Sequence, residues 1–277
     1  MKFCPNESFE KELHQLIKSN ILKIESSKLE DIYKRFRVEF DGLSNSPCKL
    51  EKEMHLIDHG IPENAYLLGL DLPIWFNNID TTGKKIIILG IDPLRNEKTF
   101  KSNGADFKTD IVIGTPYALH QLNMRNGRTK EYWEFINNLA QKNFVYVTDI
   151  YKLFFYEDSS KIRRSYDYYP TNRPLKQIYL LEQEIDLIEP DLIITLGAKS
   201  YFQLTKRHQP LLTRNIIKEE KKVYKKYNVI PMVHLSGSTR KQTKLNFLEA
   251  NEIEYQNKSF GKYYFEMINN YINNFKF

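Results

Sequence analysis

Short apolar runs recur along most of the chain after residue 84 and predict buried β-strands. They are rich in isoleucine and valine, end in a glycine or a polar residue, and span 85–90, 110–114, 143–149, 191–197 and 228–235. Apolar residues at helical spacing predict helices between several of them, over 129–142, 175–190 and 198–208. Because strands of this kind alternate with helices, the pattern predicts βαβ units and a mostly parallel sheet in an α/β protein.

The first 58 residues are polar and follow a different pattern. Apolar residues recur at helical spacing over 13–22 and 29–36, and a turn-forming cluster follows at 45–49. We therefore expect a helical N-terminal extension over 1–83, packed on an α/β domain over 84–277. Near the C-terminus, helical spacing predicts a closing amphipathic helix that covers the sheet.

Composition narrows the class of protein. The 277 residues are 41% hydrophobic, enough to bury one large core or two modest ones, and no apolar stretch approaches the length of a membrane span. The N-terminal segment carries acids where a secretion signal needs an apolar core. Cys4 and Cys48 are too few for a disulfide framework or for the usual structural metal centre. We therefore expect a cytoplasmic protein with no membrane segment, no metal and no cofactor.

The net charge of +6 is compatible with a nucleic-acid partner, because lysine and arginine neutralise phosphates. The segment 161–174 interleaves arginines, among them Arg163 and Arg164, with tyrosines. Cations beside aromatic rings suit a strand whose bases are stacked and whose phosphates are neutralised. The lysine-rich segment 218–227 is more typical of a solvated hairpin or helix face. We predict DNA contacts from Arg163 and Arg164.

Polar residues stand where the predicted strands end, at Asp92, Asp149 and His234. In folds with parallel strands the functional site lies beyond the carboxyl ends of the strands. On the residues alone, Asp92 before Pro93 is either a turn former or a reactive carboxylate. His234 is likewise either a structural histidine or a hydrogen-bond donor to a ligand.

Four stretches, in order, resemble the uracil-DNA glycosylase superfamily. They are "GIDP" (90–93), "VYVTDIYK" (145–152), "LLEQEIDLIEPDLIITLGAKSYFQL" (180–204) and "VHLSGSTR" (233–240). They are similar to the family's G-x-D-P loop, its strand that ends in Asn, its P-x-x-I-x-x-L-G strand and its final H-P-S loop. The likeness covers roughly 84–245. It implies three α/β/α layers around a central, mostly parallel four-stranded sheet, with the helical N-terminal extension added.

The resemblance implies a monofunctional DNA glycosylase, which hydrolyses the N-glycosidic bond of a flipped, modified base such as uracil or another deaminated base. Asp92 is then the carboxylate that stabilises the cationic sugar and orients a water, and His234 is the donor to the departing base. Gly90 and Ile91 line the base pocket. Tyr117 resembles the aromatic residue that stacks beneath the base, although a core tyrosine is an equal interpretation.

Asp149 departs from the family pattern. The family's Asn reads uracil by donating to O4 and accepting from N3–H, whereas an ionised Asp only accepts. Either Asp149 is protonated, or the base differs, or the pocket no longer reads a base; a capping role between strand and helix is a further interpretation. Bases that present N–H groups on this edge, such as cytosine-type or xanthine-type lesions, suit a carboxylate better than uracil does.

The last loop departs from the family pattern as well. Leu235 replaces its proline, and Ser238 stands about where an apolar wedge fills the gap left by the flipped nucleotide. Without the wedge, single-stranded or distorted DNA is the easier substrate. The predicted phosphate contacts of this loop are Ser236, Gly237, Ser238, Arg240 and Lys241.

Two other classes of function stay open. One is a DNA-binding protein on the same fold with weakened or lost glycosylase activity, and the other is an α/β hydrolase-like protein that acts on a small nucleotide or nucleoside. Asp92 and His234 favour the enzyme, whereas Asp149 and the missing wedge favour the binding protein. A small substrate would leave the segment 161–174 without a role. The oligomeric state is not predicted.

Overall fold

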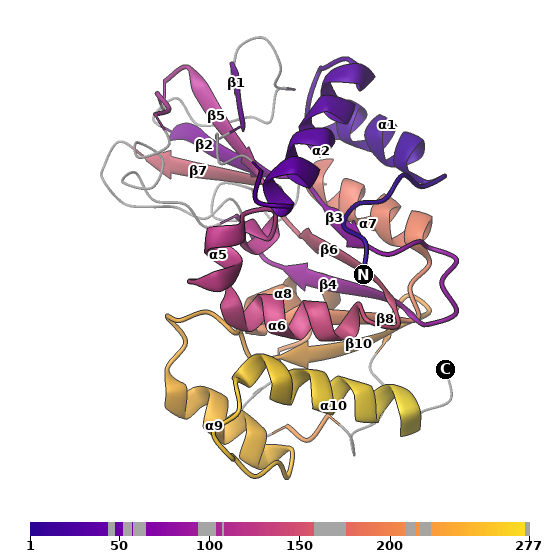
Figure 1. Cartoon of the computed structure of the whole chain (residues 1–277), viewed down its shortest axis with the longest axis vertical. Helices are drawn as coiled ribbons and strands as arrows, with labels where there is room; N and C mark the ends of the chain where they lie inside the picture. Colours follow the sequence, from indigo (N-terminus) through magenta and orange to yellow (C-terminus); the bar gives the residue numbers. More distant parts are fainter. Residues whose placement is uncertain are drawn as a thin grey trace.

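The computed structural model describes residues 1–43, 48–51, 57, 65–93, 104–106, 108–157, 176–208, 214–216 and 223–274. Two sheets and the helices around them make up this part of the chain (Figure 1). The strands are β1 (Cys48–Glu51), β2 (Ala65–Asp71), β3 (Ile74–Phe76), β4 (Lys85–Gly90), β5 (Asp110–Gly114), β6 (Phe144–Asp149), β7 (Leu153–Glu157), β8 (Leu192–Leu196), β9 (Val223–Tyr224) and β10 (Tyr227–Met232). The helices are α1 (Glu10–Asn20), α2 (Ser26–Phe40), the 3₁₀ turn η1 (Pro116–Ala118), α5 (Leu122–Asn126), α6 (Lys130–Leu139), α7 (Lys176–Ile188), α8 (Ala198–Thr205), α9 (Lys241–Ala250) and α10 (Phe260–Asn274).

The larger sheet has six strands in the order β3-β6-β4-β8-β10-β9. Its four central strands run parallel, and β3 and β9 pair antiparallel at the two edges. The prediction of a mostly parallel four-stranded sheet is therefore confirmed for the centre, and the two edge strands are additions to it. Ile86, Ile87, Ile88 and Leu89 of β4 are fully buried, which is why this strand reads as an unbroken apolar run.

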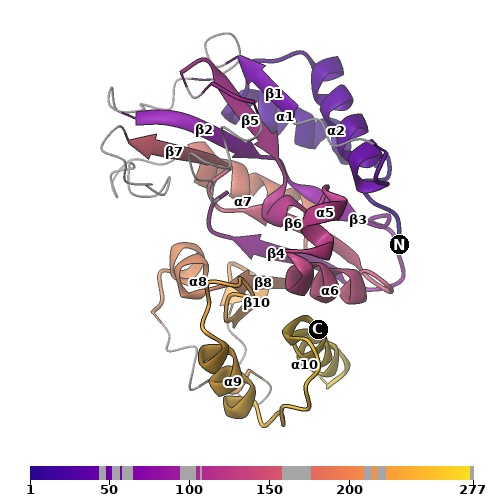
Figure 2. The same ribbon diagram turned by 60° about the vertical axis from the view of Figure 1, so that its left-hand side comes forward.

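A second sheet, in the order β1-β5-β2-β7, stands beside the first (Figure 2). The run 110–114 forms β5 of this sheet and does not join the parallel series with which it was grouped. Both edges of β4 are already paired, with β6 and with β8, so β5 does not lie beside the strand that precedes it in the chain. The chain passes from one sheet to the other directly after Asp149, where β6 ends and β7 soon begins.

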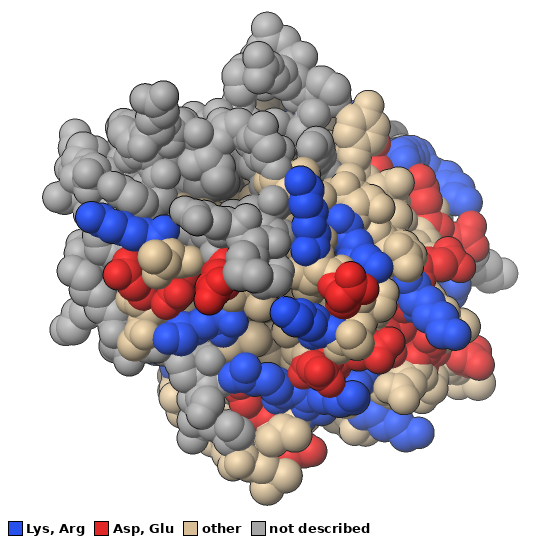
Figure 3. Space-filling view, turned by 90° about the horizontal axis from the view of Figure 1, so that it is seen from above, with Lys and Arg blue, Asp and Glu red and all other residues tan. Residues whose placement is uncertain are grey.

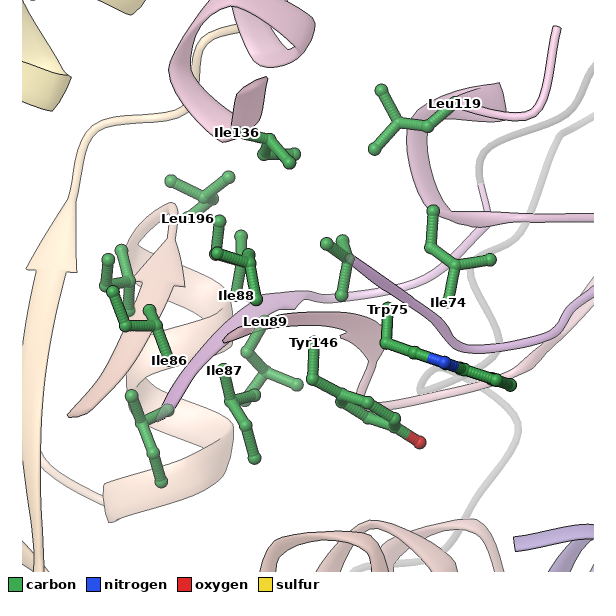
Figure 4. Packing of buried hydrophobic residues seen from close by; sticks show 14 of the residues in the cluster. Ile74, Trp75, Ile86, Ile87, Ile88, Leu89, Leu119, Ile136, Tyr146 and Leu196 are labelled. Atoms are coloured by element: carbon green, nitrogen blue, oxygen red, sulfur yellow. The ribbon is translucent and has the colours of Figure 1, made fainter. Parts of the chain in front are cut away.

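Helices cover both faces of the larger sheet, which confirms the three layers. Figure 4 shows Ile88 pointing toward Ile136 of α6, while Ile87 and Tyr146 point to the opposite face. Helix α10 packs beside α6, with the ring of Tyr264 6.1 Å from that of Phe135. Helix α7 lies on the opposite face together with α1.

The expected N-terminal helices are present as α1 and α2. They pack on the sheet through aromatic side chains: the rings of Phe9 and Tyr33 lie 5.2 and 5.3 Å from Trp75 of β3. The domain boundary between 83 and 84 stays a prediction. Contacts cross it: β3, on the N-terminal side, pairs with β6, and one cluster of buried hydrophobic residues includes members from both sides. Within the described ranges no helix is both long and apolar enough to cross a membrane.

Candidate active site

The predicted site residues that follow β4, β6 and β10 come to one edge of the larger sheet, because these strands are parallel. Gly90 is the register partner of Asp149, and β4 and β10 point to the same side of the molecule (Figure 1). Ile91, Asp92 and Asp149 are buried, with 6%, 8% and 3% of their surface exposed, and His234 is half-buried. The edge therefore holds two carboxyl groups shielded from bulk water and an imidazole that is partly accessible.

Position 90 has to be a glycine because two side chains pack directly against it. A Cβ atom added at this position would lie 2.0 Å from Oδ1 of Asp149 and 2.8 Å from the hydroxyl oxygen of Tyr117. Both distances are shorter than a normal contact between heavy atoms, which is about 3.5–4.0 Å. The absence of a side chain at Gly90 thus lets Asp149 and Tyr117 meet at the end of β4.

A continuous series of contacts leads from Tyr117 to His234. The ring of Tyr117 stacks on that of Tyr132 of α6, with centroids 4.0 Å apart and planes 11° from parallel. The Tyr132 hydroxyl lies 2.6 Å from Nδ1 of His234. Tyr132 thereby connects the Asp149 side of the edge to the imidazole.

The contacts of His234 define which ring nitrogen carries its proton. The backbone N–H of Ser236 donates to Nδ1 at 3.3 Å, so this nitrogen is an acceptor. The Tyr132 hydroxyl lies 2.6 Å from Nδ1 and 3.2 Å from Nε2 of the same ring, and burial raises the pKa of this phenol, so it keeps its proton. Because the Ser236 N–H donates to Nδ1, the proton of a neutral His234 lies on Nε2.

Tyr117 lies on a strained turn. Its φ of 57° and that of Ala118, 51°, fall in the left-handed region, which costs about 1–2 kcal/mol for each residue with a Cβ. The turn is held from outside: the Thr115 hydroxyl lies 2.9 Å from Nδ1 of His120, whose Nε2 is 3.4 Å from Glu39 of α2. The N-terminal extension thus supports the turn that carries Tyr117. The predicted stacking of Tyr117 under a base is not tested by this geometry, which places Tyr132 on one face of its ring.

A buried ion pair lies directly beneath Asp149. The Lys152 ammonium donates to the carbonyl oxygen of Asp149 and to the Thr148 hydroxyl, both at 2.6 Å, and lies 2.8 Å from Glu184 of α7. Burial raises the pKa of Glu184, and the charge of Lys152 opposes this. The pair fixes the backbone at the point where β6 ends.

Tyr132, Lys152 and Glu184 were not among the predicted site residues. Tyr132 has the helical spacing of an ordinary core residue and gives no signal of its own. Lys152 stands three residues after Asp149 within the quoted stretch 145–152. Glu184 lies on the buried, apolar side of α7, where an acid needs a partner, and this was the available signal.

The loop after β10 places its hydroxyl groups together. The Ser236 hydroxyl lies 2.8 Å from that of Ser238 and 3.1 Å from that of Thr239. The predicted contacts Gly237, Ser238, Arg240 and Lys241 are exposed, whereas Ser236 is half-buried. The loop leads into α9, so its backbone N–H groups gather at the start of a helix, where anions bind readily.

Lys244 lies behind this loop and anchors it. It is buried, donates to the carbonyl oxygen of Leu235 at 3.2 Å, and has its ammonium 5.2 Å from the ring of Phe260. Lys241 likewise rests over the ring of Tyr255 at 5.2 Å. The accessible positive charge of this part of the loop therefore comes from Arg240 and Lys241.

Arg163 and Arg164, with the rest of 161–174, lie outside the described residues, and their predicted contact with DNA is not tested. In the part of the chain that is described, no group of three or more histidine, cysteine, aspartate or glutamate side chains is placed to hold a metal ion.

A comparison with known families finds a match. The model of the Uracil DNA glycosylase superfamily matches residues 76–255, well over half of the chain. This range includes each described site residue from Gly90 to Lys241. A search of the curated proteins finds no match. On this match, the chain belongs to the uracil-DNA glycosylase superfamily.

Proposed function

We propose that this chain is a monofunctional DNA glycosylase that hydrolyses the N-glycosidic bond between a flipped, modified base and its deoxyribose. Membership of the superfamily supports DNA as the partner and glycosylase-like chemistry in general. The observation that carries the proposal is the set of groups at the sheet edge: a buried carboxyl group at Asp92, and His234 oriented as an Nε2–H donor.

The reaction needs one group on each side of the bond that breaks. As the bond from C1′ to the base nitrogen breaks, its electron pair stays with the base and positive charge develops on the sugar. The Asp92 carboxylate stabilises that charge and orients a water, whose oxygen forms the new bond to C1′ and whose proton passes to the carboxylate. His234 donates a hydrogen bond from Nε2–H to an oxygen of the departing base, where negative charge develops. The base then takes a proton from solvent.

The DNA backbone is proposed to lie along the loop after β10. Ser236, Ser238 and the N–H groups at the start of α9 offer donors to phosphate, and Arg240 offers an exposed positive charge. On the face shown in Figure 3, lysine and arginine side chains alternate with acids, so the described part of that face does not carry charge of one sign.

The test is incubation with single-stranded and duplex oligonucleotides that carry uracil, hypoxanthine or xanthine, followed by alkali, which cleaves the strand at an abasic site. We expect strand breaks with at least one lesion, at a higher rate in single-stranded than in duplex DNA, because the loop lacks an apolar wedge. Asp92→Asn, which keeps the shape of the side chain, should abolish the breaks while the protein still binds the oligonucleotide. Breaks that persist in this variant would contradict the role of Asp92.

A second candidate is a DNA-binding protein that has lost excision. The observation that favours it is Asp149, a buried carboxyl group where the family's base-reading Asn is expected. A shift of lesion-containing oligonucleotides on a gel, with no strand breaks for any base, would support this alternative. We also propose a cytoplasmic location and a role in base-excision repair; Cys4 and Cys48 are free, buried thiols, which suits a reducing compartment.

A further inference from the structure

The ion pair of Lys152 and Glu184 lies in the interior of the protein, where charge is costly. The two side chains are 1% and 0% exposed, and the ammonium nitrogen lies 2.8 Å from Oε2 of the carboxyl group. Replacing both partners of a buried ion pair with apolar residues of similar size often leaves a protein as stable as before, or more stable. Stability alone therefore does not account for this pair, and its contacts indicate a role in geometry.

Lys152 directs its three N–H donors at three different groups. Two are in β6, the Thr148 hydroxyl and the carbonyl oxygen of Asp149, both at 2.6 Å, and the third is the carboxyl group of Glu184 in α7. An ammonium group has three donors and no acceptor, so these contacts use its full capacity. The lysine therefore ties the last two residues of β6 to a helix that covers the sheet.

The segment 149–152, which the Lys152 side chain closes, is itself paired with the backbone that carries Asp92. The backbone N–H of Tyr151 donates to the carbonyl oxygen of Ile91 at 3.0 Å, and Asp92 is the next residue in the chain. The pairing of β4 with β6 thus continues past the ends of both strands. A shift of 149–152 would move Ile91 and, with it, the carboxyl group of Asp92.

We propose that Lys152 and Glu184 are positioning residues of the active site. Glu184 holds the ammonium group from the side of α7, the ammonium group holds the carbonyl oxygen of Asp149, and the segment 149–152 then holds the backbone before Asp92. The inference rests on the proposed function, in which Asp92 is the reactive carboxylate. Both residues act through the backbone and neither is proposed to touch the substrate.

The double variant Lys152→Met/Glu184→Leu tests the proposal, because it removes both charges together and leaves neither one unpaired. The 277-residue chain is used in excess over a single-stranded oligonucleotide that carries uracil or hypoxanthine, and the rate of excision at saturation is measured. Misplacing a reacting group by about 1 Å can cost about 100-fold, so we expect a rate about 100-fold lower. The affinity for an oligonucleotide with a tetrahydrofuran abasic analogue should stay unchanged, because the proposed phosphate contacts lie on the loop after β10. Thermal melting should show the double variant folded.

Glu182→Leu is the matched control. It makes the same substitution on the same helix, where Glu182 is half-buried and accepts from the Tyr224 hydroxyl at 2.9 Å, at the edge strand β9. It removes a hydrogen bond of α7 that does not lead to β6, so the rate of excision should stay unchanged.

Hydrogen exchange of the Tyr151 amide gives a second readout that needs no activity. The N–H that donates to Ile91 should exchange about tenfold faster in the double variant than in the unchanged protein, while the amides in the middle of β4 and β8 keep their protection. If the unchanged protein excises no base, the proposed function fails, and the exchange at Tyr151 alone decides the inference.

Two results would overturn the inference: exchange at Tyr151 as slow as in the unchanged protein, or an undiminished rate of excision in a folded double variant. Should the double variant fail to fold, Thr148→Val takes its place, because it keeps the shape of the side chain and removes the hydroxyl that accepts from Lys152. Thr148→Val should slow excision about tenfold and speed exchange at Tyr151. If it changes neither, Lys152 does not position the site.

Discussion

Replacing Gly90 by alanine tests the geometry of the site at its tightest point. The new Cβ would lie 2.0 Å from Oδ1 of Asp149 and 2.8 Å from the Tyr117 hydroxyl. To restore a contact of about 3.5 Å, the carboxyl group has to move by roughly 1.5 Å inside a buried pocket. Overpacking of this kind costs about 1–3 kcal/mol, which lowers the melting temperature by roughly 2–4 °C for each kcal/mol in a chain of this size.

The sign of the change in stability shows whether the new Cβ collides with its neighbours. Without a collision, a Gly→Ala change stabilises a protein by about 0.4–1 kcal/mol, because it restricts the unfolded chain. Gly237 offers the matched control for stability, since a Cβ added there has nothing within 4 Å. Thermal melting of both variants and base excision by Gly90→Ala are the assays. If Gly90→Ala melts no lower than Gly237→Ala and keeps full excision, Asp149 and Tyr117 do not pack as described.

Three further predictions concern the groups that support the site. Tyr132→Phe removes the hydroxyl contact with His234, so we expect excision about 5–10 times slower, whereas the Ser236 N–H still donates to Nδ1 and ¹⁵N shifts should still show Nε2–H; an unchanged rate of excision would contradict the role of Tyr132. Lys152→Met leaves Glu184 buried without its partner and should lower the free energy of unfolding by about 3–5 kcal/mol in urea, while adding Glu184→Leu should recover most of the loss. If the double variant is no better than the single one, the charge of Glu184 is not the cause. Burial raises the pKa of Glu39 from 4.5 to about 7, so its contribution to the free energy of unfolding is present below pH 4.5 and is lost as the pH rises toward 7. Urea unfolding from pH 4 to pH 8 measures this loss, and Glu39→Gln should remove it. If the free energy of unfolding of Glu39→Gln falls with pH as steeply as that of the unchanged protein, the carboxyl group of Glu39 is not responsible.

The central sheet was predictable from the sequence because its strands are buried on both faces. Isoleucine-rich runs such as 86–89 lack the alternation of polar and apolar residues that marks a strand with one face in solvent. Helices with apolar residues at regular spacing separate these runs. The second sheet was not predicted. Its strands β2 and β7 are paired between segments far apart in the chain, and such pairing leaves no local signal.

The site could likewise be predicted only in part. Asp92, Asp149 and His234 follow strands that turned out to be parallel, so their meeting at one edge follows from topology. Tyr132 was missed because it comes from a helix, and its contact with His234 depends on how α6 packs across the sheet. No spacing rule in the sequence specifies that packing.

The N-terminal extension has a physical connection to the site, although its separate function is not tested. Helix α2 provides Glu39 to His120 and the carbonyl oxygen of Phe40 to Arg125, on the segment that follows Tyr117. The guanidinium of Arg125 also lies 3.8 Å from the ring of Phe40. The extension is therefore best studied with residues 84–277 attached, since its removal would release the turn that carries Tyr117.

The most direct test of the account is detection of the free base by mass spectrometry. The 277-residue chain is incubated in excess with a single-stranded oligonucleotide that carries one uracil or one hypoxanthine, and both the released base and the intact abasic strand are measured. The account predicts equal amounts of the two products from the unchanged protein and neither from Asp92→Asn. Oligonucleotides that remain whole with the unchanged protein, although bound, would contradict glycosylase activity on these bases.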